Sequence, residues 1–146
     1  MRAKLKVNSI IEIIGTPKEY AEQVMGIVMD KLGERKDISI IKKEVAEAKK
    51  MDDKPFWTTF CDMQFEVESI DGLLTYCFDF LPSSVEIVEP TNFPMQNFDM
   101  NNLLNDVIAK LHEYHMALKN TQAENILLKR NIEKKEDKKN DVSTAK

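Results

Sequence analysis

Hydrophobic and polar residues follow two different periods along this chain, and the change comes near residue 90. Before it, short segments with a period of two alternate with segments of helical period. After it, one long segment carries a seven-residue repeat. A period of two indicates strands with one buried face, whereas a seven-residue repeat indicates a helix with a narrow apolar strip. We therefore predict a domain over 1–90, a linker over 91–99, a long helix over 100–135 and a disordered charged tail over 136–146.

The first ninety residues predict four strands and two helices. The segments 5–14, 38–45, 56–67 and 85–88 are rich in β-branched or aromatic residues and indicate strands. Thr16 and Ser69 can cap the intervening helices, and Pro17 suits a first helical position. The order strand, helix, strand, strand, helix, strand predicts an α+β domain of the ferredoxin-like βαββαβ type. Its four-stranded antiparallel sheet would carry both helices on one face and have the strands 5–14 and 56–67 at its centre.

The opposite face of that sheet is expected to be open and partly apolar. Its predicted apolar residues are Ile10, Ile14, Phe56, Phe60 and Val88. A contiguous apolar patch on a protein surface often marks an interaction site. We therefore expect another surface, of this chain or of a partner, to cover this face.

The long helix carries two rows of residues at heptad spacing. We call these rows the seam: Leu104, Leu111, Leu118, Asn125 and Ile132 form the first, and Val107, Tyr114, Thr121 and Leu128 the second. A strip this narrow cannot be buried on its own helix and requires a partner surface, so we predict a coiled coil. The first turns are apolar over a wider arc, which suits packing on a sheet or in a four-helix contact.

Asn125 favours a dimer in particular. An amide in an apolar seam is destabilising unless it meets another amide across a two-stranded coil, where it fixes register and strand number. The alternative is a solvent-facing Asn125 on a single helix that frays after Leu118. DNA-binding zippers carry a basic segment just before the coil, whereas this chain has residues 101–106 of sequence NNLLND there.

Charge and cysteine content narrow the classes of partner. Residues before Lys129 carry a net charge of about −7, which argues against a nucleic-acid surface, and the remainder carries about +3. No apolar stretch approaches the length of a membrane span. Cys61 and Cys77 lie among apolar residues and are expected to be buried reduced thiols. We expect a cytoplasmic protein with no membrane partner.

The turn formed by Gly15, Thr16 and Pro17 is a possible ligand site, because the N–H groups at a helix start can bind an anion. In element order and in the use of this turn, the chain resembles ligand-sensing ACT domains. That resemblance implies a small-ligand regulatory domain. The acidic residue often found in the ACT turn has no counterpart here.

Other candidate chemistry is weak. Phe56 and Phe60 invite comparison with RNA-binding sheets, but Asp62, Glu66 and Glu68 continue the strand. The carboxylate pairs Asp62 with Glu66, and Asp52 with Asp53, have no second catalytic group assigned to them. His112 and His115, with Glu113 between them, lack a third ligand, so surface histidines are the commoner explanation. We predict no catalytic residues, no metal site and no cofactor.

The segment 80–90 (FLPSSVEIVEP), with Lys110-Leu111-His112 and Lys119-Asn120, resembles small archaeal proteins of unknown function. The resemblance spans residues 1 to about 130 and implies an archaeal cytosolic protein without assigning an activity. The residues themselves favour a non-enzymatic homodimeric scaffold or adaptor that binds another protein. The alternatives are an ACT-like sensor and, more weakly, RNA binding through the sheet.

Overall fold

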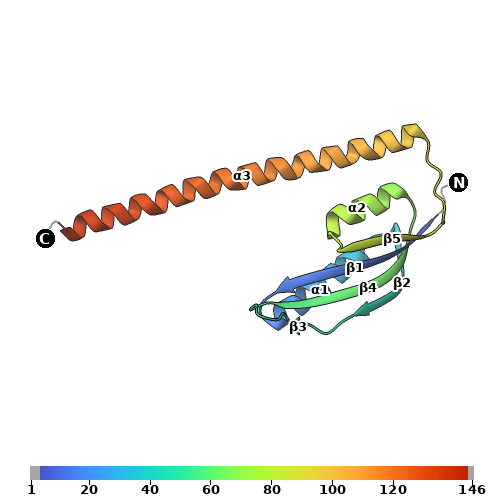
Figure 1. Ribbon diagram of the computed structural model, residues 1–146, viewed down its shortest axis with the longest axis horizontal. Helices are drawn as coiled ribbons and strands as arrows, with labels where there is room; N and C mark the ends of the chain where they lie inside the picture. The colour runs from blue at the N-terminus through green and yellow to red at the C-terminus, as the bar shows by residue number, and fades with distance from the viewer. Residues whose placement is uncertain (1–3, 145–146) are drawn as a thin grey trace. The chain divides into compact units, whose positions relative to one another are not determined.

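The computed structural model describes residues 4–144, which form two compact units that divide after Pro94. The first unit contains, in chain order, β1 (Leu5–Gly15), α1 (Lys18–Gly33), β2 (Ile38–Val45), β3 (Lys49–Lys50), β4 (Trp57–Val67), α2 (Ile70–Phe80) and β5 (Ser84–Glu89) (Figure 1). The second unit contains α3 (Asn97–Thr144). The predicted α+β class and the long C-terminal helix are confirmed.

The sheet is antiparallel and has five strands, so the prediction of four was wrong. Four strands lie in the order β2-β4-β1-β5, and the short β3 pairs with β4. β1 and β4, which contain the predicted strands 5–14 and 56–67, lie at the centre of the path. β3 falls in a segment predicted as a charged connection. Two adjacent lysines show no alternation of apolar and polar residues that would predict a strand. They are assigned to one because they pair with Trp57 and Thr58 of β4.

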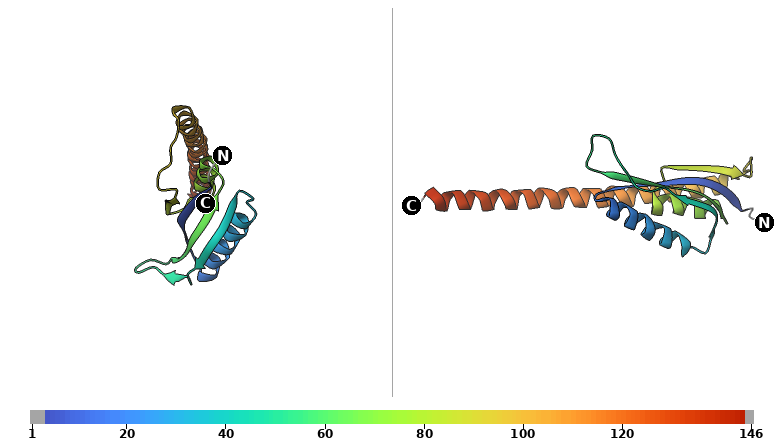
Figure 2. Two further views of the ribbon diagram at one scale, coloured as in Figure 1. Left: turned by 90° about the vertical axis from the view of Figure 1, so that its right-hand side faces the viewer. Right: turned by 90° about the horizontal axis from the view of Figure 1, so that it is seen from below.

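One face of the sheet carries the core. The side chains of Leu5, Val7 and Ile11 from β1 and those of Met63, Phe65 and Val67 from β4 are fully or almost fully buried. They join a single cluster with Met25, Met29 and Leu32 of α1 and Leu73 and Tyr76 of α2. Figure 2 shows α1 along one side of the strands. Both helices therefore cover the same face, as expected, and the other face remains open within this unit.

The two helix starts differ from each other. Ser69 caps α2, because its Oγ accepts a hydrogen bond from the Gly72 N–H at 3.0 Å, as predicted. The expectation for Thr16 was wrong: the N-cap of α1 is Pro17, and no side chain caps it. The predicted capping geometry placed the helix one residue too early.

α3 is longer than predicted. It has 48 residues, about 72 Å of helix, and begins at Asn97 rather than at residue 100. Residues 136–144, predicted to be disordered, are helical. The physical reason is composition: from Asn97 to Thr144 the chain contains neither Gly nor Pro, and its charged end is rich in Lys and Glu, which are good helix formers. No residue of this helix is buried.

Candidate functional site

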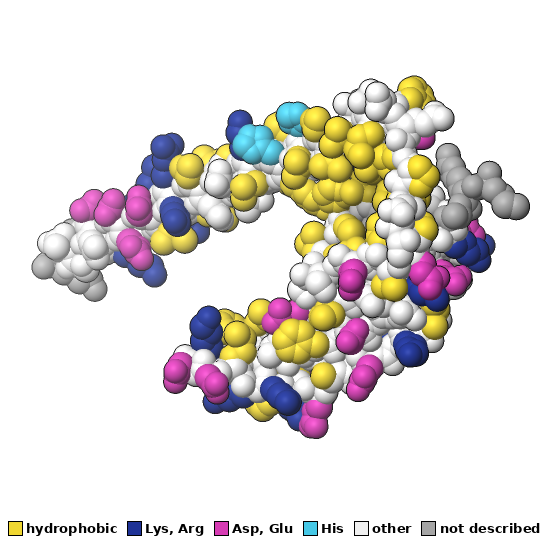
Figure 3. Space-filling view, turned by 45° about the vertical axis from the view of Figure 1, so that its right-hand side comes forward, with side chains coloured by type: hydrophobic (Ala, Val, Ile, Leu, Met, Phe, Trp, Pro, Cys, Tyr) yellow, Lys and Arg dark blue, Asp and Glu magenta, His cyan; other side chains and the backbone are white. Residues whose placement is uncertain are grey.

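The seam is a row of exposed side chains on α3. Apolar members such as Leu111 and Leu118 are each 56% exposed, and only Val107 among the nine seam residues is half-buried. Figure 3 shows hydrophobic side chains on the surface of this helix. An apolar strip of this length in contact with water is unfavourable, since each large aliphatic side chain gains about 1.5–3 kcal/mol on full burial. The seam is therefore the strongest candidate for a contact surface in the chain.

Thr121 and Asn125, two polar residues of the seam, differ in whether their side chains are already hydrogen-bonded. The Thr121 hydroxyl donates to the carbonyl oxygen of Ala117 in its own helix at 3.0 Å, so it can enter an apolar contact with its hydrogen bond already made. Asn125 has no hydrogen bond from its side chain to any described residue, and its side chain is exposed. A side-chain amide has two donor hydrogens and an acceptor oxygen, so burying Asn125 in a covered seam requires a polar partner for it.

The open sheet face mixes apolar and hydrogen-bonded polar side chains. Ile10 lies opposite Asp62, Glu12 opposite Phe60, and Ile14 opposite Thr58. Phe60 is therefore flanked diagonally by Ile10 and Ile14, within reach of an aromatic ring. Phe56 immediately precedes β4, and Val88 lies where the pairing of β1 with β5 shifts register, outside the regular alternation.

Polar contacts interrupt this face. The Thr58 hydroxyl donates to Glu12 at 3.0 Å, and the Gln64 amide donates to Asn8 at 3.0 Å. A hollow of about 620 Å³ beside β2 is lined mainly by polar side chains, among them Lys42 and Asp62. The apolar residues predicted for this face are thus a small diagonal group among carboxylates and amides.

The turn at Gly15 is filled by the chain itself. A Cβ added at Gly15 would lie 2.9 Å from Cδ1 of Tyr20, so the close approach is made by this ring. Next to the turn, Lys18 Nζ lies 2.8 Å from Oε1 of Glu47 and 5.7 Å from the centre of the Trp57 ring. The hydrogen bond from Lys18 holds the pKa of the Glu47 carboxyl below its usual value. No local sequence pattern indicates this pairing, because 29 residues separate its members.

A groove lies beside that pair, and sequence reasoning missed it. It has a volume of about 370 Å³ and is lined by Met25, Gly26 and Met29 of α1, by Val45 of β2, and by residues of the following loop. Alternation in β2 marks Val45 only as a strand residue, so no local signal pointed to a groove.

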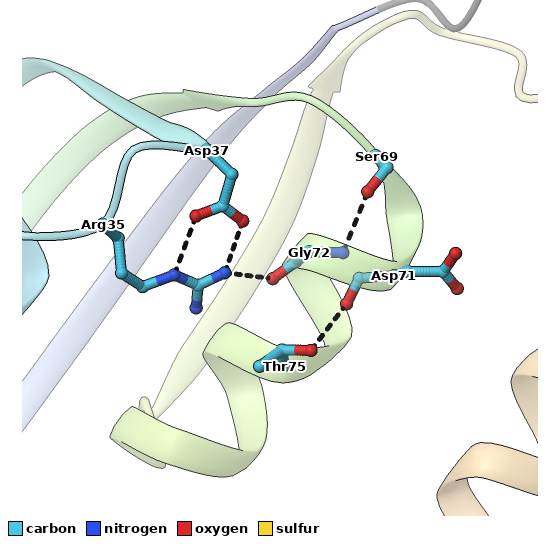
Figure 4. A network of polar contacts seen from close by, with 6 residues as sticks. All are labelled: Arg35, Asp37, Ser69, Asp71, Gly72 and Thr75. Carbon is cyan, nitrogen blue, oxygen red and sulfur yellow. Dashed lines mark hydrogen bonds and ion pairs between the residues drawn. The ribbon is translucent and has the colours of Figure 1, made fainter.

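Arg35, Asp37 and Gly72 form a polar network that ties the start of β2 to α2 (Figure 4). Arg35 Nε donates to Oδ1 of Asp37 at 3.0 Å, and its Nη2 bonds both Oδ2 of Asp37 and the carbonyl oxygen of Gly72. The guanidinium holds the pKa of the Asp37 carboxyl below its usual value. Because the acid and the base neutralise each other, the network is suited to fixing α2 in place.

The remaining candidates show no assembled chemistry. His112 and His115 are both exposed on α3, and no group of three or more potential metal ligands gathers within residues 4–144. Cys61 is buried with its Sγ 3.5 Å from Sδ of Met29, and Cys77 is half-buried. Burial raises the pKa of both thiols, which keeps them protonated at neutral pH. No helix in the described part of the chain has the length and apolar character needed to cross a membrane.

Comparison with known proteins gives one match. The protein-family model described as the MJ0538 family matches residues 6–140. Searches of curated proteins and of solved structures found no significant match. The matched range includes both the sheet and most of α3, so the two units occur together in that family's pattern.

Proposed function

The chain belongs to the MJ0538 family, and from that premise we propose that it is a non-enzymatic homodimeric scaffold or adaptor in which α3 joins two copies. The observation that carries this proposal is the seam. It holds seven of the fifteen large apolar residues of α3 at heptad spacing, while no residue of the helix is buried within its own chain. A second copy supplies a surface of the same shape and spacing.

The free energy available from burying the seam is of the size that a stable dimer needs. About four heptads lie between Leu104 and Ile132. The seven apolar seam residues of each copy are roughly half exposed, so covering them in both copies gains about half of 1.5–3 kcal/mol each, in total about 10–21 kcal/mol, which is of the same size as or larger than the cost of association of about 4–15 kcal/mol. The dimer would leave the open sheet face of each copy for another protein. Cytoplasmic location and this second partner remain predictions.

We also propose a ferredoxin-like classification for the first unit. The strand order β2-β4-β1-β5 and the presence of both helices in one core cluster support it. In this interpretation β3 is an addition at the turn before β4.

The alternative functions have less support. A ligand-sensing domain would use the turn at Gly15, but the Tyr20 ring already occupies the space that this glycine leaves. Binding of RNA through the sheet would bring phosphates near Glu12, Asp62 and Glu66 on the open face. Neither alternative would account for an exposed seam on α3.

Light scattering of the full chain in solution tests the dimer. Leu118→Glu in the seam should convert a dimer to a monomer, because the change places a carboxylate of each copy in the apolar contact. Met116→Glu is the matched control: Met116 is 57% exposed, as against 56% for Leu118, but lies off the seam on the same helix. A monomeric parent chain, or an equal loss of mass in both variants, would refute the proposal.

A further inference from the structure

We infer that the two copies of α3 pair in parallel and in register, so that both sheet units emerge from the same end of the coil. This inference rests on the proposed dimer and adds its direction. It follows from Asn125, a seam residue whose side-chain amide forms no hydrogen bond to any described residue. Scaffolds that present two domains at one end can engage a partner with two matching sites.

In a parallel coil each seam residue faces its own copy. Asn125 then meets Asn125 of the second chain, where the amide of one can donate to the carbonyl oxygen of the other. The layers above and below, Leu118 with Thr121 and Leu128 with Ile132, exclude water from this pair while making no polar demand beyond the internally bonded Thr121. The amide of Asn125 and the hydroxyl of Thr121 therefore both have hydrogen-bond partners in this arrangement.

An antiparallel coil pairs the first row with the second. In the alignment that matches the seam end to end, Leu104 faces Leu128 and Asn125 faces Val107. A shift by one heptad brings Asn125 against the ring of Tyr114 instead. In neither register does Asn125 meet a second amide: twice per dimer it faces either Val107, which has no polar side-chain group, or Tyr114, whose single hydroxyl cannot satisfy both the donors and the acceptor of the amide. Each unpaired buried amide lowers the association constant by roughly five- to 150-fold.

Flanking charges give a smaller preference in the same direction. In the parallel register, Glu124 of one chain lies beside Lys129 of the other, and neither forms an ion pair within the described residues. The antiparallel register places Glu124 beside Lys110, which already pairs with Glu113 of its own helix at 3.3 Å. Exposed pairs contribute little, so Asn125 decides the direction.

The distance between spin labels on α3 tests the direction in the full chain. We would introduce Lys138→Cys, attach a nitroxide label and measure the distance within the dimer by double electron–electron resonance. Parallel helices, with axes 8–10 Å apart, should give a distance below about 30 Å including both labels. The two antiparallel registers should give about 55 to 66 Å at 1.5 Å per residue. A labelled chain without the added cysteine measures any signal from Cys61 and Cys77.

The outcomes separate this inference from the proposed function. A short distance supports the parallel coil, whereas a long one overturns it and leaves the homodimer intact. A monomeric mass without an intermolecular distance overturns the dimer itself. Asn125→Leu should add a long-distance population because it removes the main penalty on antiparallel pairing, while Asn120→Leu, off the seam, should not. An unchanged distribution in Asn125→Leu would contradict the role assigned to this residue.

Discussion

Ser9 and Tyr76 form a buried pair of hydrogen-bonded hydroxyl groups, which we call the relay. Which hydroxyl is the donor determines how much stability is lost when either one is removed. Tyr76 is completely buried, with its Oη 2.8 Å from Oγ of Ser9, and Ser9 Oγ donates to the carbonyl oxygen of Ser84 at 2.8 Å. A serine hydroxyl has a single hydrogen. Because Ser9 gives its hydrogen to Ser84, Tyr76 must be the donor to Ser9. The relay thus joins α2 to β1 and β1 to the edge strand β5.

This direction predicts unequal effects of removing each partner. Tyr76→Phe removes a donor but keeps the ring, whose centre lies 4.9 Å from that of Phe65 and 5.5 Å from that of Phe80, so we expect a loss of about 1 kcal/mol. Ser9→Ala leaves the buried Tyr76 hydroxyl without an acceptor and the Ser84 carbonyl without this donor. We therefore expect a loss of about 2–3 kcal/mol. The double variant should cost less than the sum, because it leaves no orphaned hydroxyl.

Urea unfolding of the full chain, followed by circular dichroism at one protein concentration, measures these free energies. The concentration must be held fixed because dimerisation adds to the apparent stability. Thr75→Ala, which removes an exposed hydrogen bond from α2 to its own backbone, is the control and should change stability by less than about 0.5 kcal/mol. If Tyr76→Phe proved as costly as Ser9→Ala, or if the two effects simply added, the assigned direction of the relay would be wrong.

Three further predictions concern packing and pH. Gly72→Ala should destabilise the chain by about 1–3 kcal/mol, because its Cβ would lie 2.7 Å from Oδ2 of Asp37. Gly26→Ala, whose Cβ would have nothing within 4 Å, should instead stabilise the chain by about 0.5–1 kcal/mol. Equal effects of the two substitutions in thermal unfolding would contradict this account. Arg35 lowers the pKa of Asp37 in the folded state, so the stabilisation from this pair should be fully present above the unfolded-state pKa and should be lost as the pH falls through the folded-state pKa. Asp37→Asn should flatten this decline of stability at acid pH, and an unchanged decline would exclude Asp37 as its cause. Burial raises the pKa of Tyr76 to about 12 from 10.0, so the unfolded chain loses this proton first as the pH rises, and the stability of the fold should decline between those two pH values. Tyr76→Phe should reduce this decline, and an equal decline in that variant would argue against this cause.

Regular alternation in the sequence allowed much of the sheet unit to be predicted. β1 and β4 carry side chains that are alternately buried and less buried along most of their length, so their face assignments followed directly from residue order. The cap at Ser69 was equally local, because the capping hydroxyl and the N–H that it accepts from lie three residues apart. Local patterns of this kind need no knowledge of the rest of the fold.

Other features depend on residues that are distant in sequence. The bond from Arg35 to Gly72 spans 37 residues and that from Lys18 to Glu47 spans 29, so no window of sequence contains either pair. β3 is defined by its partner strand, and its two lysines carry no pattern of their own. The turn at Gly15 suggested a ligand because the position of the Tyr20 ring depends on how α1 packs.

The heptad spacing of apolar residues along α3 indicates a partner helix more specifically than their exposure does. Apolar residues scattered on a helix would face all directions, and single exposed ones require no explanation. A seven-residue repeat drifts by about 20° per heptad on a straight helix, so over the four heptads from Leu104 to Ile132 the strip turns by only about 80° around the helix. A surface that covers such a strip must be equally long and must follow this gradual turn, as a supercoiled second helix does. The sheet unit also exposes large apolar side chains such as Phe60, but its open face interrupts them with carboxylates and amides. A second α3 meets the requirement with the same spacing, and it also supplies the amide that Asn125 lacks.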